Sequence, residues 1–175
     1  MKLEPLDRNH VPLVASWLAD EQNHRWLDFG RGRQVIPSAG LMVMRQQPFH
    51  RLFTFPAPDL DADQPVGVVG LSDISTRFRY ATLWYVLGDK ARARQGYTSR
   101  AVRAALQIAF QEMDLHSVEA WALEKNQGSI AVLRNNGFRE MGRRRECHEI
   151  DGRLQDRIHF DILAHDFLEY EARHG

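Results

Sequence analysis

The sequence predicts a single α/β domain over residues 1–175, an α+β arrangement in which helices flank one mixed sheet. Its 175 residues are enough for one domain with a real core and too few for two comfortable ones. Apolar residues alternate with a period of two in some segments and recur every 3.6 residues in others. The predicted sheet begins and ends in hairpins, whereas a mononucleotide-binding fold alternates strands and helices regularly.

The first half of the chain predicts two helices followed by a hairpin. A short strand precedes a helix over 8–19, and a second helix follows Pro37 with Leu41, Met42, Met44 and Phe49 facing inward. The polar connections are expected at 22–34 and 56–65, and the two strands of an antiparallel hairpin at 50–55 and 66–74.

The second half predicts a central strand, two helices and a closing hairpin. The segment 80–88 is nearly continuous in apolar residues, as a buried central strand is. The remaining expected elements are a helix over 98–113, a strand over 117–123, a helix near 128–135, a β-hairpin that turns at Asp151-Gly152, and a charged, frayed tail.

Composition and charge narrow the possible partners. Lysine and arginine (23) balance aspartate and glutamate (23), which argues against broad binding to nucleic acid or to an anionic membrane. We expect neither partner, and no signal peptide or membrane span, because no apolar run reaches about 18 residues. The single Cys147 excludes an internal disulfide and fits a reducing cytoplasm. The eight histidines show no metal-ligand spacing, so no metal is expected.

The stretch 91–101, ARARQGYTSRA, predicts either a simple helix cap or a phosphate cradle. It joins the strand 80–88 to the helix that begins at Thr98. The first amides of a helix have no internal partners and lie at the positive end of its dipole. Gly96 allows an anion to approach them closely, although the three glycines of a dinucleotide fold and the glycine-lysine pair of a P-loop are absent.

A second constellation, EKNQGSIAVLRNNGF (124–138), follows the next strand. Asn126 and Ser129 stand at the start of a helix that Gly137-Phe138 closes, and helix capping alone accounts for such residues. The pair nevertheless comes about 30 residues after the glycine loop and beyond the partner strand, which is expected to place it opposite that loop.

Together these residues resemble the GNAT acetyltransferase superfamily, in particular the RimJ/RimL-like N-terminal acetyltransferases. The similar segments are the loop Ala93-Arg94-Gln95-Gly96-Tyr97-Thr98 with Ser99-Arg100-Ala101, the central strand 81–88, the stretch from Asn126 through Ser129 to Gly137-Phe138, and the closing hairpin with Asp156. The resemblance runs from about residue 65 to 168. It implies the GNAT fold, a mostly antiparallel central sheet whose middle strands splay apart.

The chain also departs from the family pattern. Ala93, Thr98 and Arg100 replace the usual residues of the loop, and Thr82 stands where many relatives carry a glutamate on the central strand. Leu133 occupies the place of a tyrosine that serves as general acid elsewhere, and Trp121 the place of a glutamate base.

The resemblance implies that acetyl-CoA, the acyl donor, lies in the V between the central strand and strand 117–123. An amide near Val86 or Leu87 would stabilise the oxyanion, and Ser129 would donate a proton to the departing thiolate or cap its helix. The residues expected to bind the donor are Val86, Leu87, Arg94, Gln95, Gly96, Tyr97, Thr98, Ser99, Asn126 and Ser129.

The acceptor amine must be neutral to attack. At pH 7 neutralisation costs about 4–5 kcal/mol for a lysine-like amine and about 1–1.5 kcal/mol for an α-amino group. Glu119 and Asp73 are the candidate bases, although each is also accounted for as a structural or solvated residue. Trp26, Asp28 and Phe29 are considered for the acceptor pocket and Tyr85 for the acetyl pocket, with core packing as the alternative for the aromatic residues. The triplet Arg143-Arg144-Arg145 is either solvated or meets a phosphate or an acidic acceptor.

The predicted function is therefore an N-acetyltransferase that acts on a protein or peptide N-terminus, as a monomer or homodimer in the cytoplasm. An antibiotic, amino sugar or polyamine is the alternative acceptor. A non-catalytic module that binds acyl-CoA is the third possibility, because Thr82 and Trp121 stand at the positions where relatives carry a glutamate base.

Overall fold

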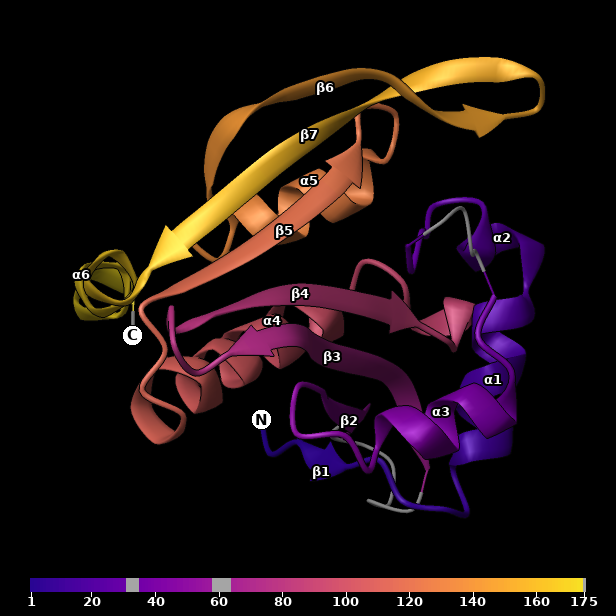
Figure 1. Ribbon diagram of the computed structural model, residues 1–175, viewed down its shortest axis with the longest axis horizontal. Helices are drawn as coiled ribbons and strands as arrows, with labels where there is room; N and C mark the ends of the chain where they lie inside the picture. The colour runs from indigo at the N-terminus through magenta and orange to yellow at the C-terminus, as the bar shows by residue number, and fades with distance from the viewer. Residues whose placement is uncertain (31–34, 58–63, 175) are drawn as a thin grey trace.

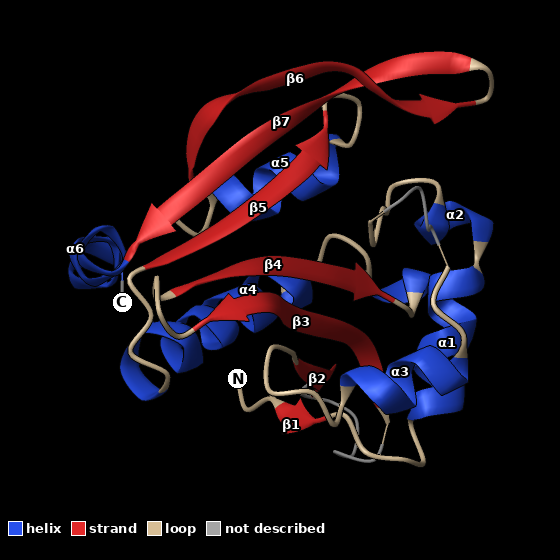
Figure 2. Ribbon diagram, viewed as in Figure 1, coloured by secondary structure: helices blue, strands red, loops and turns tan. Residues whose placement is uncertain are grey.

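The computed structural model describes residues 1–30, 35–57 and 64–174, and within them one seven-stranded sheet carries helices on both faces (Figure 1; Figure 2). The strands are β1 (Glu4–Pro5), β2 (Arg51–Pro56), β3 (Pro65–Ser75), β4 (Tyr80–Leu87), β5 (Ser117–Leu123), β6 (Arg139–Ile150) and β7 (Arg153–Leu163). The helices are α1 (Val11–Ala19), α2 (Glu21–His24), α3 (Ser38–Met44), α4 (Tyr97–Gln107), α5 (Gln127–Arg134) and α6 (Ala164–His174), with a 3₁₀ turn η1 (Lys90–Arg92) and a π-helical turn η2 (Ile108–Glu112). The predicted α/β class with a mixed sheet is confirmed.

The sheet has the strand order β1-β2-β3-β4-β5-β7-β6, and every neighbouring pair is antiparallel except β4 and β5. These two parallel strands pair only from Tyr80–Thr82 to Ser117–Glu119. Beyond this short ladder they diverge, so that the sheet opens between them (Figure 1). The opening separates a β1–β4 half from a β5–β7 half.

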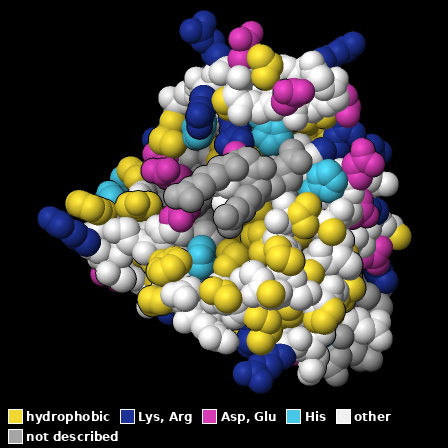
Figure 3. All heavy atoms as spheres, turned by 45° about the vertical axis from the view of Figure 1, so that its right-hand side comes forward, with side chains coloured by type: hydrophobic (Ala, Val, Ile, Leu, Met, Phe, Trp, Pro, Cys, Tyr) yellow, Lys and Arg dark blue, Asp and Glu magenta, His cyan; other side chains and the backbone are white. Residues whose placement is uncertain are grey.

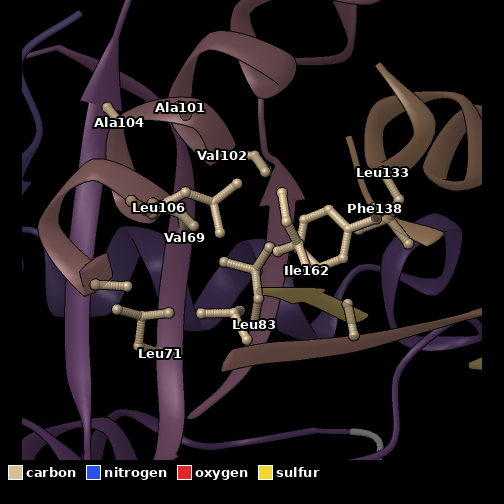
Figure 4. Packing of buried hydrophobic residues seen from close by; sticks show 14 of the residues in the cluster. Val69, Leu71, Leu83, Ala101, Val102, Ala104, Leu106, Leu133, Phe138 and Ile162 are labelled. Atoms are coloured by element: carbon tan, nitrogen blue, oxygen red, sulfur yellow. The ribbon is translucent and has the colours of Figure 1, made fainter. Parts of the chain in front are cut away.

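Two hydrophobic clusters hold the helices to the sheet. On one face Val69, Leu71 and Leu83 pack under α4, whose Val102 and Leu106 are fully buried (Figure 4). On the other face a smaller cluster joins α1 and α3 to the sheet; its members include Val14, Leu18, Leu41, Val68 and Val86. The alternation of neighbouring strand residues between the two clusters is the period of two that the sequence shows.

Two expectations were wrong. Phe49 is 45% exposed and packs against the ring of His50 at 4.8 Å, because the chain has already left α3 and turns into β2 there. The tail over residues 164–174 is not frayed: it forms α6, since Phe167 is buried against Phe110 at 5.4 Å and anchors the helix to the core. The predicted connections 22–34 and 56–65 lie partly outside the described residues, at 31–34 and 58–63.

Candidate active site

A cleft of about 1500 Å³ occupies the opening between β4 and β5. The face that carries α1 and α3 is rich in hydrophobic side chains, with histidines and carboxylates nearby (Figure 3). The described residues that line the cleft include ones from the segment before residue 31, from α3, from β3 and both splayed strands, from the starts of α4 and α5, and from the β6–β7 hairpin. The cleft therefore runs between the β1–β4 half and the β5–β7 half of the sheet.

The peptide groups of β4 are directed alternately to β3 and to the opening. The amide of Gly88 donates to Val66 of β3 over 2.8 Å, and Val86 is paired with Val68 in the same phase. By this alternation the peptide groups of Tyr85 and Leu87 are directed to the opening. Of the two amides expected near the thioester, that of Leu87 has this orientation and that of Val86 is directed to β3.

The start of α4 is an uncapped helix terminus. Gly96 precedes it in the left-handed conformation (φ 76°), and no described side chain caps its amides. By contrast, Asn126 caps α5 by accepting a hydrogen bond from the amide of Ser129 over 3.2 Å. The free amides and the positive end of the α4 dipole fit an anion such as a pyrophosphate.

The predicted donor-binding residues divide into two groups. The ones that line the cleft are Val86, Leu87, Arg94, Thr98, Asn126 and Ser129. Gln95, Gly96, Tyr97 and Ser99 do not line it: the first two are exposed at the loop, and Ser99 accepts a hydrogen bond from Asn136 over 3.0 Å. Arg100 lies over the ring of Tyr97 at 4.8 Å.

Ser129 and Tyr85 form a hydroxyl pair between α5 and β4. Their hydroxyl oxygens are 2.8 Å apart, and the Tyr85 hydroxyl is also 3.1 Å from the carbonyl of Ser129. Burial raises the pKa of Tyr85 well above its usual range, so its hydroxyl keeps its proton. Both residues line the cleft. Leu133, which occupies the position of the family's tyrosine, is buried in the core.

Trp26, Asp28 and Phe29 also line the cleft, and Asp28 forms an ion pair with Arg157 of β7 over 2.5 Å. Burial opposes the charge of Asp28, but hydrogen bonds from Arg157 and Gly30 hold its pKa below the usual value. Arg157 also lies 4.1 Å from the ring centre of Trp121.

His148 contacts the same arginine. Its Nδ1 accepts a hydrogen bond from Arg157 over 3.0 Å, which leaves the proton on Nε2 for donation to the carbonyl of Arg25, also over 3.0 Å. Burial is the main reason that the pKa of His148 is lowered. The segment before residue 31 is thereby fastened to the β6–β7 hairpin by buried polar contacts.

Glu119 of β5 and Asp73 of β3 both line the cleft and are exposed. Asp73 has φ 53° at an irregularity in the β3–β4 ladder. Thr82 and Trp121 line the same cleft. The arginines of the triplet differ in their surroundings. Arg144 lines the cleft, whereas Arg143 donates hydrogen bonds to Glu124 over 2.9 Å and to Asp156 over 3.0 Å.

Two cleft histidines were missed by sequence reasoning, His50 directly before β2 and His159 on β7. The pKa of each is lowered, mainly by burial. They lie far apart in the sequence and on different strands, so no spacing motif marks either one.

Other classes of site receive no support from the described part of the chain. Among these residues no group of three or more His, Cys, Asp or Glu side chains is arranged to hold a metal ion. None of the helices found within them is both long and apolar enough to cross a membrane.

Comparison with known proteins supports the resemblance. Residues 1–139 match the model of the acetyltransferase (GNAT) domain, which is most of the 175-residue chain. The chain belongs to the GNAT acetyltransferase family.

Curated bacterial relatives are named as N-acetyltransferases. The probable N-acetyltransferase YjcK of Bacillus subtilis is 35% identical over 105 residues, which cover 59% of this chain and 58% of that protein. The putative ribosomal N-acetyltransferase YdaF of the same species is 26% identical over 101 residues, which cover 58% of this chain and 55% of that protein. In both cases the chain spans less than two thirds of the length of the relative.

Solved structures share the whole fold. A spermidine N-acetyltransferase from Vibrio cholerae in complex with CoA and spermine superposes with a TM-score of 0.82, covering 95% of this chain and 97% of that one, at 20% identity. The spermidine/spermine N-acetyltransferase SpeG from V. cholerae in complex with manganese ions superposes with a TM-score of 0.77, covering 96% of this chain and 95% of that one, at 20% identity.

Proposed function

We propose that the chain is an acetyl-CoA-dependent N-acetyltransferase whose acceptor is a primary amine. The observation that carries the proposal is the split between β4 and β5, which joins the uncapped start of α4 to the Tyr85–Ser129 hydroxyl pair in one cleft. A donor with a pyrophosphate at one end and a thioester at the other fits this arrangement.

The donor would be held along β4. Its pyrophosphate would accept hydrogen bonds from the amides of the loop that runs from Arg94 to Ser99, with the Arg94 guanidinium nearby. Its extended amide arm would add to the opening as a partial strand, bonded to the peptide groups of Tyr85 and Leu87. The amide of Leu87 then has the orientation required to stabilise the thioester oxyanion, a contribution of about 3–4 kcal/mol for one donor in other enzymes.

The transfer joins the amine to the acetyl group of this donor. The neutral amine attacks the thioester carbon, a C–N bond forms, and the C–S bond breaks to release the thiolate. Ser129 donates a proton to that thiolate and regains one from solvent, with the Tyr85 hydroxyl 2.8 Å away to hold its orientation. Its capped amide fixes the backbone of the same residue.

The finer proposal is that the acceptor is the α-amino group of a peptide or protein. The described charged residues that line the cleft are four cations (Lys90, Arg94, Arg144, Arg157) and three carboxylates (Asp28, Asp73, Glu119). Asp28 is already neutralised by Arg157, so this lining does not favour a highly cationic acceptor. An α-amino group is also cheaper to neutralise than an alkylamine, by about 3 kcal/mol at pH 7.

A polyamine is the second candidate acceptor. The fold neighbours from Vibrio cholerae are spermidine N-acetyltransferases, and Asp73 and Glu119 offer two exposed carboxylates in the cleft. A polyamine would place its cationic chain between them.

Release of free CoA thiol tests both candidates. Acetyl-CoA is incubated with the protein and either a short peptide with a free N-terminus, the same peptide with a blocked N-terminus, or spermidine. Release with the free peptide alone supports the proposal. Release with spermidine alone would replace the acceptor, and acetyl-CoA binding with no acceptor-dependent release would indicate a binding module instead.

A further inference from the structure

His50 is anchored to the floor of the cleft by two other side chains. Its Nδ1 lies 3.0 Å from the hydroxyl of Ser72, and the indole N–H of Trp84 donates to the same hydroxyl over 2.9 Å. Ser72 is buried, and all three residues line the cleft. Gly70 makes room for this arrangement, because a Cβ at that position would lie 2.4 Å from the indole ring of Trp84.

The geometry leaves one imidazole nitrogen available. The Trp84 indole can only donate, so the Ser72 oxygen accepts from it. The Ser72 hydroxyl then either accepts from Nδ1–H of His50 or donates its own proton to Nδ1, and a general base at Nε2 requires the first of these two tautomers. In that tautomer Nε2 carries a lone pair, and no hydrogen bond joins Nε2 to any residue that the structure describes. The ring is half-buried and borders the cleft, so this lone pair is accessible to a ligand there.

We propose that Nε2 of His50 is the general base that removes the proton from the acceptor amine, with Ser72 and Trp84 as its positioning residues. The proposal rests on the acetyltransferase function proposed above and assigns a role that neither the sequence motifs nor the carboxylates supply.

The surroundings of His50 favour the neutral ring. Burial lowers its pKa, and the carboxylate of Asp73 on β3 opposes this only in part, so the ring is neutral and basic at pH 7. From β2, the guanidinium of Arg51 donates to the backbone carbonyl of His50 over 3.0 Å, and the ring of Phe49 packs against the imidazole. After it takes a proton, the imidazolium keeps its Nδ1–H bond to Ser72 and gains the attraction of Asp73.

The other candidate bases lack this anchoring. Glu119 and Asp73 are exposed, and no hydrogen bond or ion pair to a described residue fixes either side chain. Arg157 and Arg144 lower the pKa of His159 further, Glu119 opposes them, and no hydroxyl of a described residue is hydrogen-bonded to its ring. A base acts efficiently when it is held within hydrogen-bond reach of the proton that it removes.

The protons balance across the reaction. The acceptor ammonium gives one proton to Nε2 and becomes a neutral amine, which then forms the C–N bond. The nitrogen loses its second surplus proton to solvent as the C–S bond breaks, and the thiolate gains one from Ser129. His50 returns its proton to solvent, so each turnover yields one amide, one CoA thiol and one free proton.

This base selects the class of acceptor. Relative to an unperturbed imidazole near pKa 6.5, proton transfer is unfavourable by about 30-fold from an α-amino group near 8 and about 10⁴-fold from an alkylamine near 10.4. Because the pKa of His50 is lowered, both penalties are larger still. An amine of low pKa, such as a peptide α-amino group, is therefore the acceptor that His50 can serve.

The test compares His50→Asn with wild type and with His116→Asn, whose exposed imidazole lies outside the cleft. Asparagine keeps an amide near the Nδ1 position, so the bond to Ser72 is retained while the base is lost. We expect the kcat of His50→Asn with the peptide to fall about 10²–10⁴-fold, with an unchanged Kd for acetyl-CoA. The wild-type rate should rise with pH through a pKa below 6.5, and the variant should lack that rise.

Chemical rescue separates a base from a structural residue. His50→Ala removes the ring, and added imidazole should restore a concentration-dependent part of the lost rate. A wild-type kcat and pH profile in His50→Asn, or a loss of rate in His50→Ala that imidazole leaves unchanged, would overturn the role of His50. An absence of acetyl transfer in the wild type would instead overturn the proposed function, so the two failures are distinguishable.

Discussion

Removal of the Asp28 carboxylate tests whether its ion pair with Arg157 of β7 holds the segment before residue 31 at the cleft. In Asp28→Asn the Arg157 guanidinium, whose side chain is only 9% exposed, loses its ionic partner and keeps the contacts with His148 and Trp121. Breaking a buried pair on one side costs about 3–5 kcal/mol, and we expect the lower end because Asp28 is 17% exposed. For a domain of this size that corresponds to a fall in Tm of about 6–12 °C.

Asp151→Asn is the matched control. Asp151 is paired with Arg25 of the same segment over 2.5 Å, but its side chain is 74% exposed. Such a pair contributes about 0–1 kcal/mol, so the Tm should fall by no more than about 2–4 °C.

Differential scanning fluorimetry measures both variants, and acceptor kinetics accompany it. Asp28→Asn should raise the KM for the acceptor while the Kd for acetyl-CoA stays unchanged, because Asp28 is not part of the proposed donor site. Equal and small shifts in Tm for the two variants would refute the account of the Asp28–Arg157 ion pair.

Three further perturbations follow from the same site. Gly96→Trp should abolish acetyl-CoA binding in calorimetry by covering the free amides of α4; an unchanged Kd would remove the phosphate-cradle assignment. Ser129→Ala should lower turnover more than donor affinity, whereas matched losses of thermal stability and binding at a preserved rate per site would leave Ser129 a structural residue only. The pKa of His148 is lower in the folded state than in the unfolded state, so neutral His148 contributes to stability above pH 6.5. This contribution is lost as the pH falls from 6.5 through the folded-state pKa. His148→Gln should flatten this part of the pH–stability curve, and an unaltered curve would contradict the assignment.

The segments proposed to bind the donor were predictable as turn and helix-cap elements because their residues are local in sequence. Gly96 and Asn126 each stand at a strand-to-helix junction, where turn and capping chemistry leaves a recognisable pattern. The strong apolar runs likewise predicted β4 and β5 to within one residue at each end.

The segments proposed to bind the acceptor were less predictable because their arrangement depends on contacts between residues far apart in the sequence. Asp28 and Arg157 are 129 positions apart, and His50 meets Ser72 only after β2 and β3 pair. Period-based reasoning also missed α6, whose helix is stabilised by the burial of Phe167 in a core made of other segments.

Calorimetric titration of the protein with acetyl-CoA, with CoA and ATP as controls, tests the central claim most directly. If the split between β4 and β5 is a donor site, acetyl-CoA and CoA bind at micromolar concentration and ATP does not. If neither acetyl-CoA nor CoA binds, the start of α4 is an ordinary helix terminus and the cleft serves another ligand.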